Sequence, residues 1–138
     1  MKLDSLQLQL CDIQGRLFER SLSEGIDSAA FVRAFMEGPT AAGYDRTFDR
    51  AQWMGEGYLL DEVDEEAGGL PRTGASLDGE ALYWMGYTYR YWHFLTGESS
   101  KDIYVQADAA TMNGVYPAYH TLSCEMAVER LKEMAHPL

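Results

Sequence analysis

The segment from residue 82 to 97, LYWMGYTYRYWHFLTG, constrains the fold more than any other part of this chain. It holds two of the three tryptophans and four of the nine tyrosines among the 138 residues. On a helix its large side chains would not keep to one face, and a helix that is apolar nearly all round is buried or covered on several sides. We therefore expect a central helix over about 79–96, with Asp78 as its N-cap and Gly97 at its end.

In the rest of the chain, apolar residues recur every three or four positions, as in amphipathic helices, and no stretch alternates as a strand would. The period and the cap residues predict helices over about 2–22 and 28–37, from 45 or 49 to 66, after Asp108, and over about 124–135, with a short additional one after Ser99. We expect an all-α fold, in which residues 1–138 form a single domain of about six helices around the aromatic-rich one.

The first and the third of these predicted helices contain glycines that affect their stability. Gly15 costs up to about 1 kcal/mol relative to alanine, so we expect a weak point in the first helix. Gly55 and Gly57 either weaken the third helix or let another helix approach it closely. Trp53 and Tyr58 are expected among the apolar members of that helix.

The net charge of −11 excludes some classes of function and suggests another. Binding of DNA or RNA requires basic patches, and anionic membranes also attract basic proteins. No apolar run approaches the roughly 18 residues of a membrane span. The first residues do not resemble a signal peptide, and Cys11 and Cys124 have no metal-ligand spacing, which indicates reduced thiols and a cytoplasmic location. Two readings of the net charge are open. It serves solubility alone, or it speeds the encounter with a basic protein partner.

Arg90 stands in the middle of the aromatic segment. A guanidinium buried there must be paired or stacked, because burial of an isolated charge is very costly. One reading is a structural ion pair or cation–π contact. The other is a ligand pocket at the aromatic helix, in which Arg90 acts with His93, Tyr87 and Tyr91. The familiar metal, hydrolase and nucleotide motifs do not occur, so we expect no metal, no cofactor and no catalytic residue.

A run of carboxylates ends the predicted third helix, where the helix dipole disfavours negative charge by a few tenths of a kcal/mol per group. Two readings are open: the run is a solvated edge, or it docks a basic partner. The run consists of Asp61, Glu62, Asp64, Glu65 and Glu66.

The segments GYTYRYWHFLTGESSKDIY (86–104) and YHTLSCEMAVERLKE (119–133) resemble a family of small, uncharacterised, mostly helical bacterial proteins. The pattern of that family is GYxYRYWHxxTGESSKxIY followed by YHTLxxEMAI, and the resemblance covers the chain from about residue 48 onward. The TG-S-x-x-IY and HT elements are also similar to those of small helical companions of ADP-ribosyltransferase-like toxins. That similarity implies an antitoxin-like role and assigns no functional residue.

Together these features predict a non-enzymatic acidic protein that binds and neutralises a basic protein partner, such as a toxin, as an antitoxin or immunity protein does. A nucleic-acid-mimicking inhibitor is a variant of this hypothesis. The alternative is a small-molecule-binding or enzymatic helical domain with a pocket at the aromatic helix. Partner binding requires an exposed patch, whereas a ligand site requires Arg90, His93 and the tyrosines to converge on a cavity.

Overall fold

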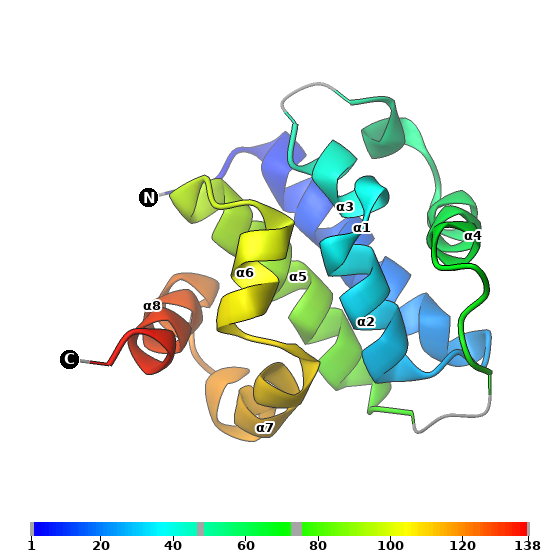
Figure 1. Cartoon of the computed structure of the whole chain (residues 1–138). Helices are drawn as coiled ribbons and strands as arrows, with labels where there is room; N and C mark the ends of the chain where they lie inside the picture. Colours follow the sequence, from blue (N-terminus) through cyan, green and yellow to red (C-terminus); the bar gives the residue numbers. More distant parts are fainter. Residues whose placement is uncertain (1, 47–48, 73–75, 138) are drawn as a thin grey trace.

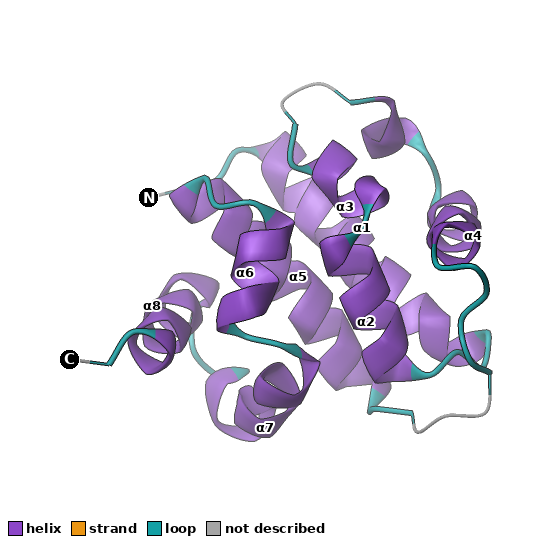
Figure 2. Cartoon of the chain, viewed as in Figure 1, coloured by secondary structure: helices purple, strands orange, loops and turns teal. Residues whose placement is uncertain are grey.

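The computed structural model describes residues 2–46, 49–72 and 76–137, and within these ranges every regular element is helical (Figures 1 and 2). The all-α prediction is confirmed, although short helices raise the number above the expected six or so. None of the helices in these ranges is both long enough and apolar enough to cross a lipid bilayer. The elements are α1 (Ser5–Ser23), α2 (Ser28–Glu37), α3 (Pro39–Tyr44), the 3₁₀ helix η1 (Arg50–Trp53), α4 (Glu56–Glu66), α5 (Gly79–Thr96), α6 (Ser100–Gln106), α7 (Ala109–Tyr119) and α8 (Cys124–Ala135).

Side-chain caps fix where most of these helices begin. Asp4 accepts a hydrogen bond from the N–H of Gln7 at 2.8 Å, and the Gln7 side chain accepts one from the N–H of Asp4 at 3.0 Å. This capping box starts α1 at Ser5, three residues later than the apolar period suggests. The remaining side-chain caps are Asp27 for α2, Asp78 for α5, Ser99 for α6, Asp108 for α7 and Ser123 for α8.

α1 and α5 run antiparallel, side by side, through the middle of the molecule (Figure 1). Their backbones meet at two glycines. A Cβ on Gly86 would lie 2.5 Å from the carbonyl oxygen of Gln14, and one on Gly15 would lie 2.8 Å from the Tyr83 ring. The expectation that Gly15 is a weak point is therefore wrong, because the missing Cβ allows the two helices to touch. Gln14 adds a hydrogen bond across the contact, from its Nε2 to the carbonyl oxygen of Gly86 at 3.0 Å.

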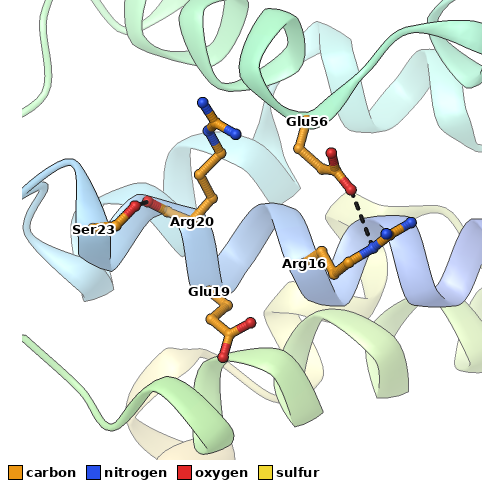
Figure 3. Close-up of a pocket in the computed structure, with 5 residues that line it drawn as sticks. All are labelled: Arg16, Glu19, Arg20, Ser23 and Glu56. Carbon is orange, nitrogen blue, oxygen red and sulfur yellow. Dashed lines mark hydrogen bonds and ion pairs between the residues drawn. The ribbon is translucent and has the colours of Figure 1, made fainter.

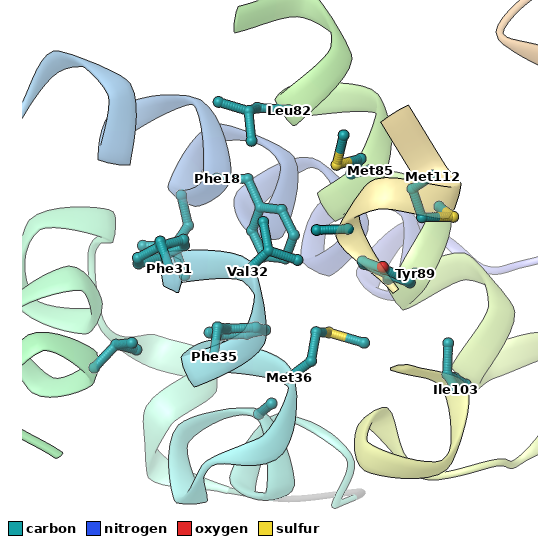
Figure 4. Close-up of a cluster of buried hydrophobic side chains, with 14 of the residues drawn as sticks. Phe18, Phe31, Val32, Phe35, Met36, Leu82, Met85, Tyr89, Ile103 and Met112 are labelled. Atoms are coloured by element: carbon teal, nitrogen blue, oxygen red, sulfur yellow. The ribbon is translucent and has the colours of Figure 1, made fainter. Parts of the chain in front are cut away.

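The apolar core fills the space between α1, α2 and α5 (Figure 4). Phe18 of α1 lies at its centre and is completely buried. Its ring packs edge-on against Phe31, Phe35 and Tyr89 at centroid distances of 5.7, 5.4 and 6.1 Å. Such pairs add about 0.5–1.5 kcal/mol each to the burial of the rings.

The aromatic helix α5 is central, but it is not buried all round. One face is fully buried and includes Leu82, Tyr89 and Trp92. α6, α7 and α8 also pack against α5, but they leave much of its other side half-exposed. The large half-buried side chains there are Tyr83, Trp84, Tyr87, Tyr91, Phe94 and Leu95.

The third predicted helix is shorter than expected. Gly55 is extended, with φ −75° and ψ 163°, so α4 begins only at Glu56, and residues 47–48 of the predicted range lie outside the described residues. Trp53 is 76% exposed and Tyr58 47%, so neither belongs to the core as predicted. The close helix contact considered for Gly55 is not found, because a Cβ there would meet nothing within 4 Å. At Gly57 the nearest atoms to an added Cβ belong to the guanidinium of Arg20 of α1, the closest at 3.3 Å, so a side chain of another helix does approach this glycine.

The glycine contact between α1 and α5 gives a stability prediction. We expect Gly86→Ala to lower the free energy of unfolding by about 2 kcal/mol or more, because the added methyl group meets backbone and the helices must separate. Gly114→Ala is the matched control, since Gly114 also lies inside a helix and a Cβ there would meet nothing within 4 Å. That control should raise stability by up to about 1 kcal/mol. Urea unfolding of both variants tests the contact, and equal effects of the two substitutions would contradict it.

Candidate functional site

Arg90 is fully buried and lies at the centre of a polar cluster. Its Nε donates to Gln14 Oε1 at 2.7 Å, its Nη1 to Asp45 Oδ1 at 2.7 Å, and its Nη2 to Ser100 Oγ at 3.1 Å. The guanidinium carbon also lies 5.4 Å from the centroid of the Tyr44 ring. Every nitrogen of the guanidinium therefore has a protein partner, and the residue has no exposed surface to offer to a ligand.

Asp45 completes this cluster from the end of α3. Its side chain is 14% exposed, and it accepts from the N–H and the hydroxyl of Ser100 at 2.8 and 2.7 Å. Burial lowers the pKa of Arg90, and the adjacent Asp45 carboxylate acts in the opposite direction. The cluster joins α1, α3, α5 and the first turn of α6, and it pairs a charge that could not be buried alone.

The four residues that the sequence grouped into a ligand pocket do not converge. His93 Nδ1 lies 2.6 Å from the carbonyl oxygen of Glu98 and 3.6 Å from Asp45 Oδ1, which places it near the Arg90 cluster. Tyr87 and Tyr91 lie elsewhere around α5. The pKa values of both are raised, chiefly by burial. The Ser100 hydroxyl donates to the Asp45 carboxylate and not to His93, whose Nδ1 lies against the Glu98 carbonyl oxygen.

The acidic run on α4 does not form one surface either. Asp64 accepts from the N–H of Leu70 at 2.7 Å and from Arg72 at 2.8 Å, and the hydrogen bond from Arg72 lowers its pKa. Glu66 accepts from the Thr40 hydroxyl, 2.9 Å from each of its carboxylate oxygens. Both carboxylates are therefore used within the fold. Asp64 binds the segment that follows α4, and Glu66 binds the start of α3. Of the other three, Asp61 and Glu65 are exposed and Glu62 is half-buried.

A groove that the sequence did not suggest follows the outer side of α1. It consists of two hollows of about 330 and 380 Å³ that share Leu6, Leu10 and Gln52 as walls, and we call it the α1 groove. His93 and Phe94 line the first hollow, and Trp53 and Met54 line the second. This groove could not be predicted from the sequence, because an apolar period does not show that Leu6 and Trp53 are exposed.

The α1 groove continues toward α4 into a third hollow of about 430 Å³, which is lined by charged residues (Figure 3). Arg16 lines both this hollow and the second one. Its guanidinium is paired with Glu56 at 3.1 Å and Asp12 at 3.2 Å. In Figure 3 the side chains of Arg16 and Glu56 meet between α1 and α4. The positive charge of Arg16 is thus balanced by carboxylates of the same chain.

Glu98, just after α5, joins three helices. Its carboxylate accepts from Trp92 Nε1 at 3.2 Å, from Gln106 Nε2 and from Lys132 Nζ. Burial disfavours the charged form, but the hydrogen bonds outweigh it and lower the pKa of Glu98 to about 2. Sequence reasoning missed this residue, since an isolated Glu between two helices carries no periodic signal. The segment GESS (97–100) therefore has structural roles in this protein.

Within the described residues, no group of three or more His, Cys, Asp or Glu side chains could hold a metal ion. A comparison with models of protein families, with curated proteins and with solved structures finds no match to this chain.

Glu98 makes stability depend on pH in the acid range. Because its pKa is lower in the folded chain than the ordinary 4.5, the ionised form stabilises the fold above that pH. The contribution is lost as the pH falls toward about 2. When the pH falls from 5 to 2, the free energy of unfolding of the wild type should decrease by about 2 kcal/mol more than that of Glu98→Gln. This value is reduced from the full effect of the pKa shift, because the ion pair is partly exposed to solvent. Thermal unfolding across this range tests it, with Glu129→Gln, an exposed site on α8, as the control. Parallel pH profiles of the wild type and Glu98→Gln would contradict this role.

Proposed function

We propose that this chain is a non-enzymatic binding protein that captures a basic protein partner, and that the α1 groove is where the partner docks. An antitoxin or immunity protein acts in this way. The nucleic-acid-mimicking variant has the same charge requirement, but it needs carboxylates in a regular row. The α4 carboxylates do not supply such a row, because Asp64 and Glu66 are used in internal hydrogen bonds.

The exposure of Trp53 carries the proposal. Trp53 is 76% exposed on η1 beside a hollow that Leu6, which is 48% exposed, also lines. Exposed apolar side chains that are grouped at a hollow are typical of sites that another molecule covers. Tryptophan is also the residue type most enriched among the few side chains that dominate binding energy at interfaces.

The charges around the α1 groove favour a basic occupant. The carboxylates of Asp4 and Asp45 line one hollow, and that of Asp12 lines the other. Of these three, Asp45 is paired with Arg90 and Asp12 with Arg16. Within the described residues, Asp4 is therefore the carboxylate for which the structure gives no ion pair. The arginines at the groove are already paired: Arg46 with Asp49 at 3.3 Å, and Arg16 with Asp12 and Glu56. A partner segment with an apolar face and basic residues beside it complements this arrangement, and the net charge of −11 would speed its approach.

The α4 carboxylates then have a smaller part than the sequence suggested. Asp61 and Glu65 are the exposed members that remain for long-range attraction. A ligand or enzymatic site built on Arg90 has less support, because each guanidinium nitrogen already has a protein partner.

The proposal predicts that removal of Trp53 weakens binding without weakening the fold. The probe is a synthetic 18-residue amphipathic helix with leucines on one face and lysines on the other, and its binding is followed by fluorescence anisotropy. Trp53→Ala should raise its Kd about 30-fold, equivalent to a loss of about 2 kcal/mol. Val105→Ala is the matched control, because Val105 is 78% exposed on α6, outside the groove.

Added salt and a charge-reversed peptide test the basic character of the partner. Binding of the lysine peptide should weaken between low and high salt, whereas a peptide with glutamate in place of each lysine should not bind. Equal affinities of the Trp53→Ala and Val105→Ala variants for the lysine peptide, or equal binding of both peptides to the wild type, would overturn the proposal.

A further inference from the structure

A separate pocket of about 370 Å³ lies where the first half of α5 meets α1 and α7. Its volume is at the small end of the range of ligand sites, which suits a small group better than an extended molecule. It shares Glu19 with the charged hollow beside α4, but no lining residue with the two hollows that make up the α1 groove. The residues around it are Glu19, Glu80, Tyr83, Trp84, Tyr116 and His120.

Aromatic rings form the walls of this pocket, and neighbouring groups fix their orientation. The Trp84 ring meets Tyr116 at a centroid distance of 5.7 Å and an interplanar angle of 65°, so the two rings form a corner. His120 stacks on Tyr116 at 4.6 Å. The Tyr83 hydroxyl donates to Asp12 at 2.5 Å, which holds that ring in place. The rings are thus positioned before any ligand arrives.

The charge around the rings is negative. Two of the six lining residues are carboxylates, Glu19 from α1 and Glu80 from α5, and none is Lys or Arg. Glu19 points toward α5, on the opposite side of α1 from Arg20 (Figure 3). The pKa of Tyr116 is raised by burial and, further, by the negative charges of Glu80 and Asp78.

We propose that this pocket binds an alkylated ammonium group, whose cation lies against the Trp84 and Tyr116 rings and is balanced by Glu19 and Glu80. The faces of aromatic rings attract cations, and a methylated ammonium also fills an apolar corner that a hydrated ion would not. A neutral apolar ligand would gain from the rings but not from the carboxylates. The ammonium group could belong to a small molecule of the choline type or to a methylated lysine of a protein, and the chemistry is the same. This site does not depend on the α1 groove or on its partner.

Titration with choline tests the site, with 3,3-dimethyl-1-butanol as a neutral molecule of nearly the same shape. The three tryptophan indole N–H signals are followed by NMR in protein labelled with ¹⁵N. Choline should shift the Trp84 signal with a Kd at least fivefold lower than that of the neutral analogue. The signals of Trp92, which is fully buried, and of Trp53 in the α1 groove should stay in place. Equal affinities of the two compounds, or no shift of Trp84 at tens of millimolar choline, would overturn the proposal.

The carboxylates are tested by Glu19→Gln combined with Glu80→Gln, which removes charge from two exposed positions and preserves shape. This variant should bind choline at least fivefold more weakly and the neutral analogue unchanged. Glu129→Gln on α8 is the control and should bind choline as the wild type does. A double variant that keeps full choline affinity would contradict the role of the carboxylates.

The source of the ammonium group is decided by comparing choline with short peptides that contain trimethyllysine or unmodified lysine. Tighter binding of the trimethyllysine peptide assigns the site to a protein side chain. Tighter binding of choline assigns it to a small molecule. If the lysine peptide binds as well as its trimethylated form, the proposal fails, since the pocket then does not recognise the alkyl groups.

Discussion

The fully buried guanidinium of Arg90 is the constraint on which much of this structure depends. A charge at that depth is tolerated only if an opposite charge pairs with it and further hydrogen bonds satisfy it. The partners come from three other elements: Gln14 of α1, Asp45 at the end of α3 and Ser100 in the first turn of α6. Gln14 also donates to the carbonyl oxygen of Gly86, where α1 and α5 touch. The same residue therefore binds the buried guanidinium and joins the two helices at their closest backbone contact. If one partner were lost, the others would be left buried with unsatisfied charge or hydrogen bonds.

The sequence predicted those parts of the fold that depend on neighbouring residues. The caps at Asp78, Ser99 and Asp108 could be identified because each cap bonds N–H groups only two or three positions away. The contact of Gly15 with α5 could not be predicted, because a glycine inside a helix looks like a weakness until a second one, 71 positions further on at Gly86, is known to face it. The exposure of Trp53 was also unpredictable, since an apolar period does not show whether a helix has been replaced by a short 3₁₀ turn.

In the candidate site, too, features that depend on neighbouring residues could be predicted, whereas contacts between distant residues could not. Sequence reasoning singled out Arg90 correctly as a residue that must be paired, but it could not name Asp45, which lies 45 positions away. The segments that carry the family resemblance include Arg90, Trp92, Glu98 and Ser100, all of which take part in hydrogen bonds that join helices. These residues therefore have structural roles in this chain. The two proposed recognition surfaces differ in their relation to the Arg90 cluster: Asp45 lines one hollow of the α1 groove, whereas the aromatic pocket with Trp84 shares no residue with the cluster.

A double-mutant cycle on Arg90 and Asp45, measured by urea unfolding, tests the central claim most directly. If the pair holds the fold, Arg90→Met should cost about 3–5 kcal/mol, because Asp45 is left with its partner gone. Combining it with Asp45→Asn should cost clearly less than the sum of the two single losses, with a coupling of about 1 kcal/mol or more. The control is Arg33→Met, which breaks an exposed ion pair with Glu37 and should change stability by less than about 0.5 kcal/mol. An Arg90→Met variant as stable as that control would contradict the account, since the guanidinium would then be free to serve a ligand.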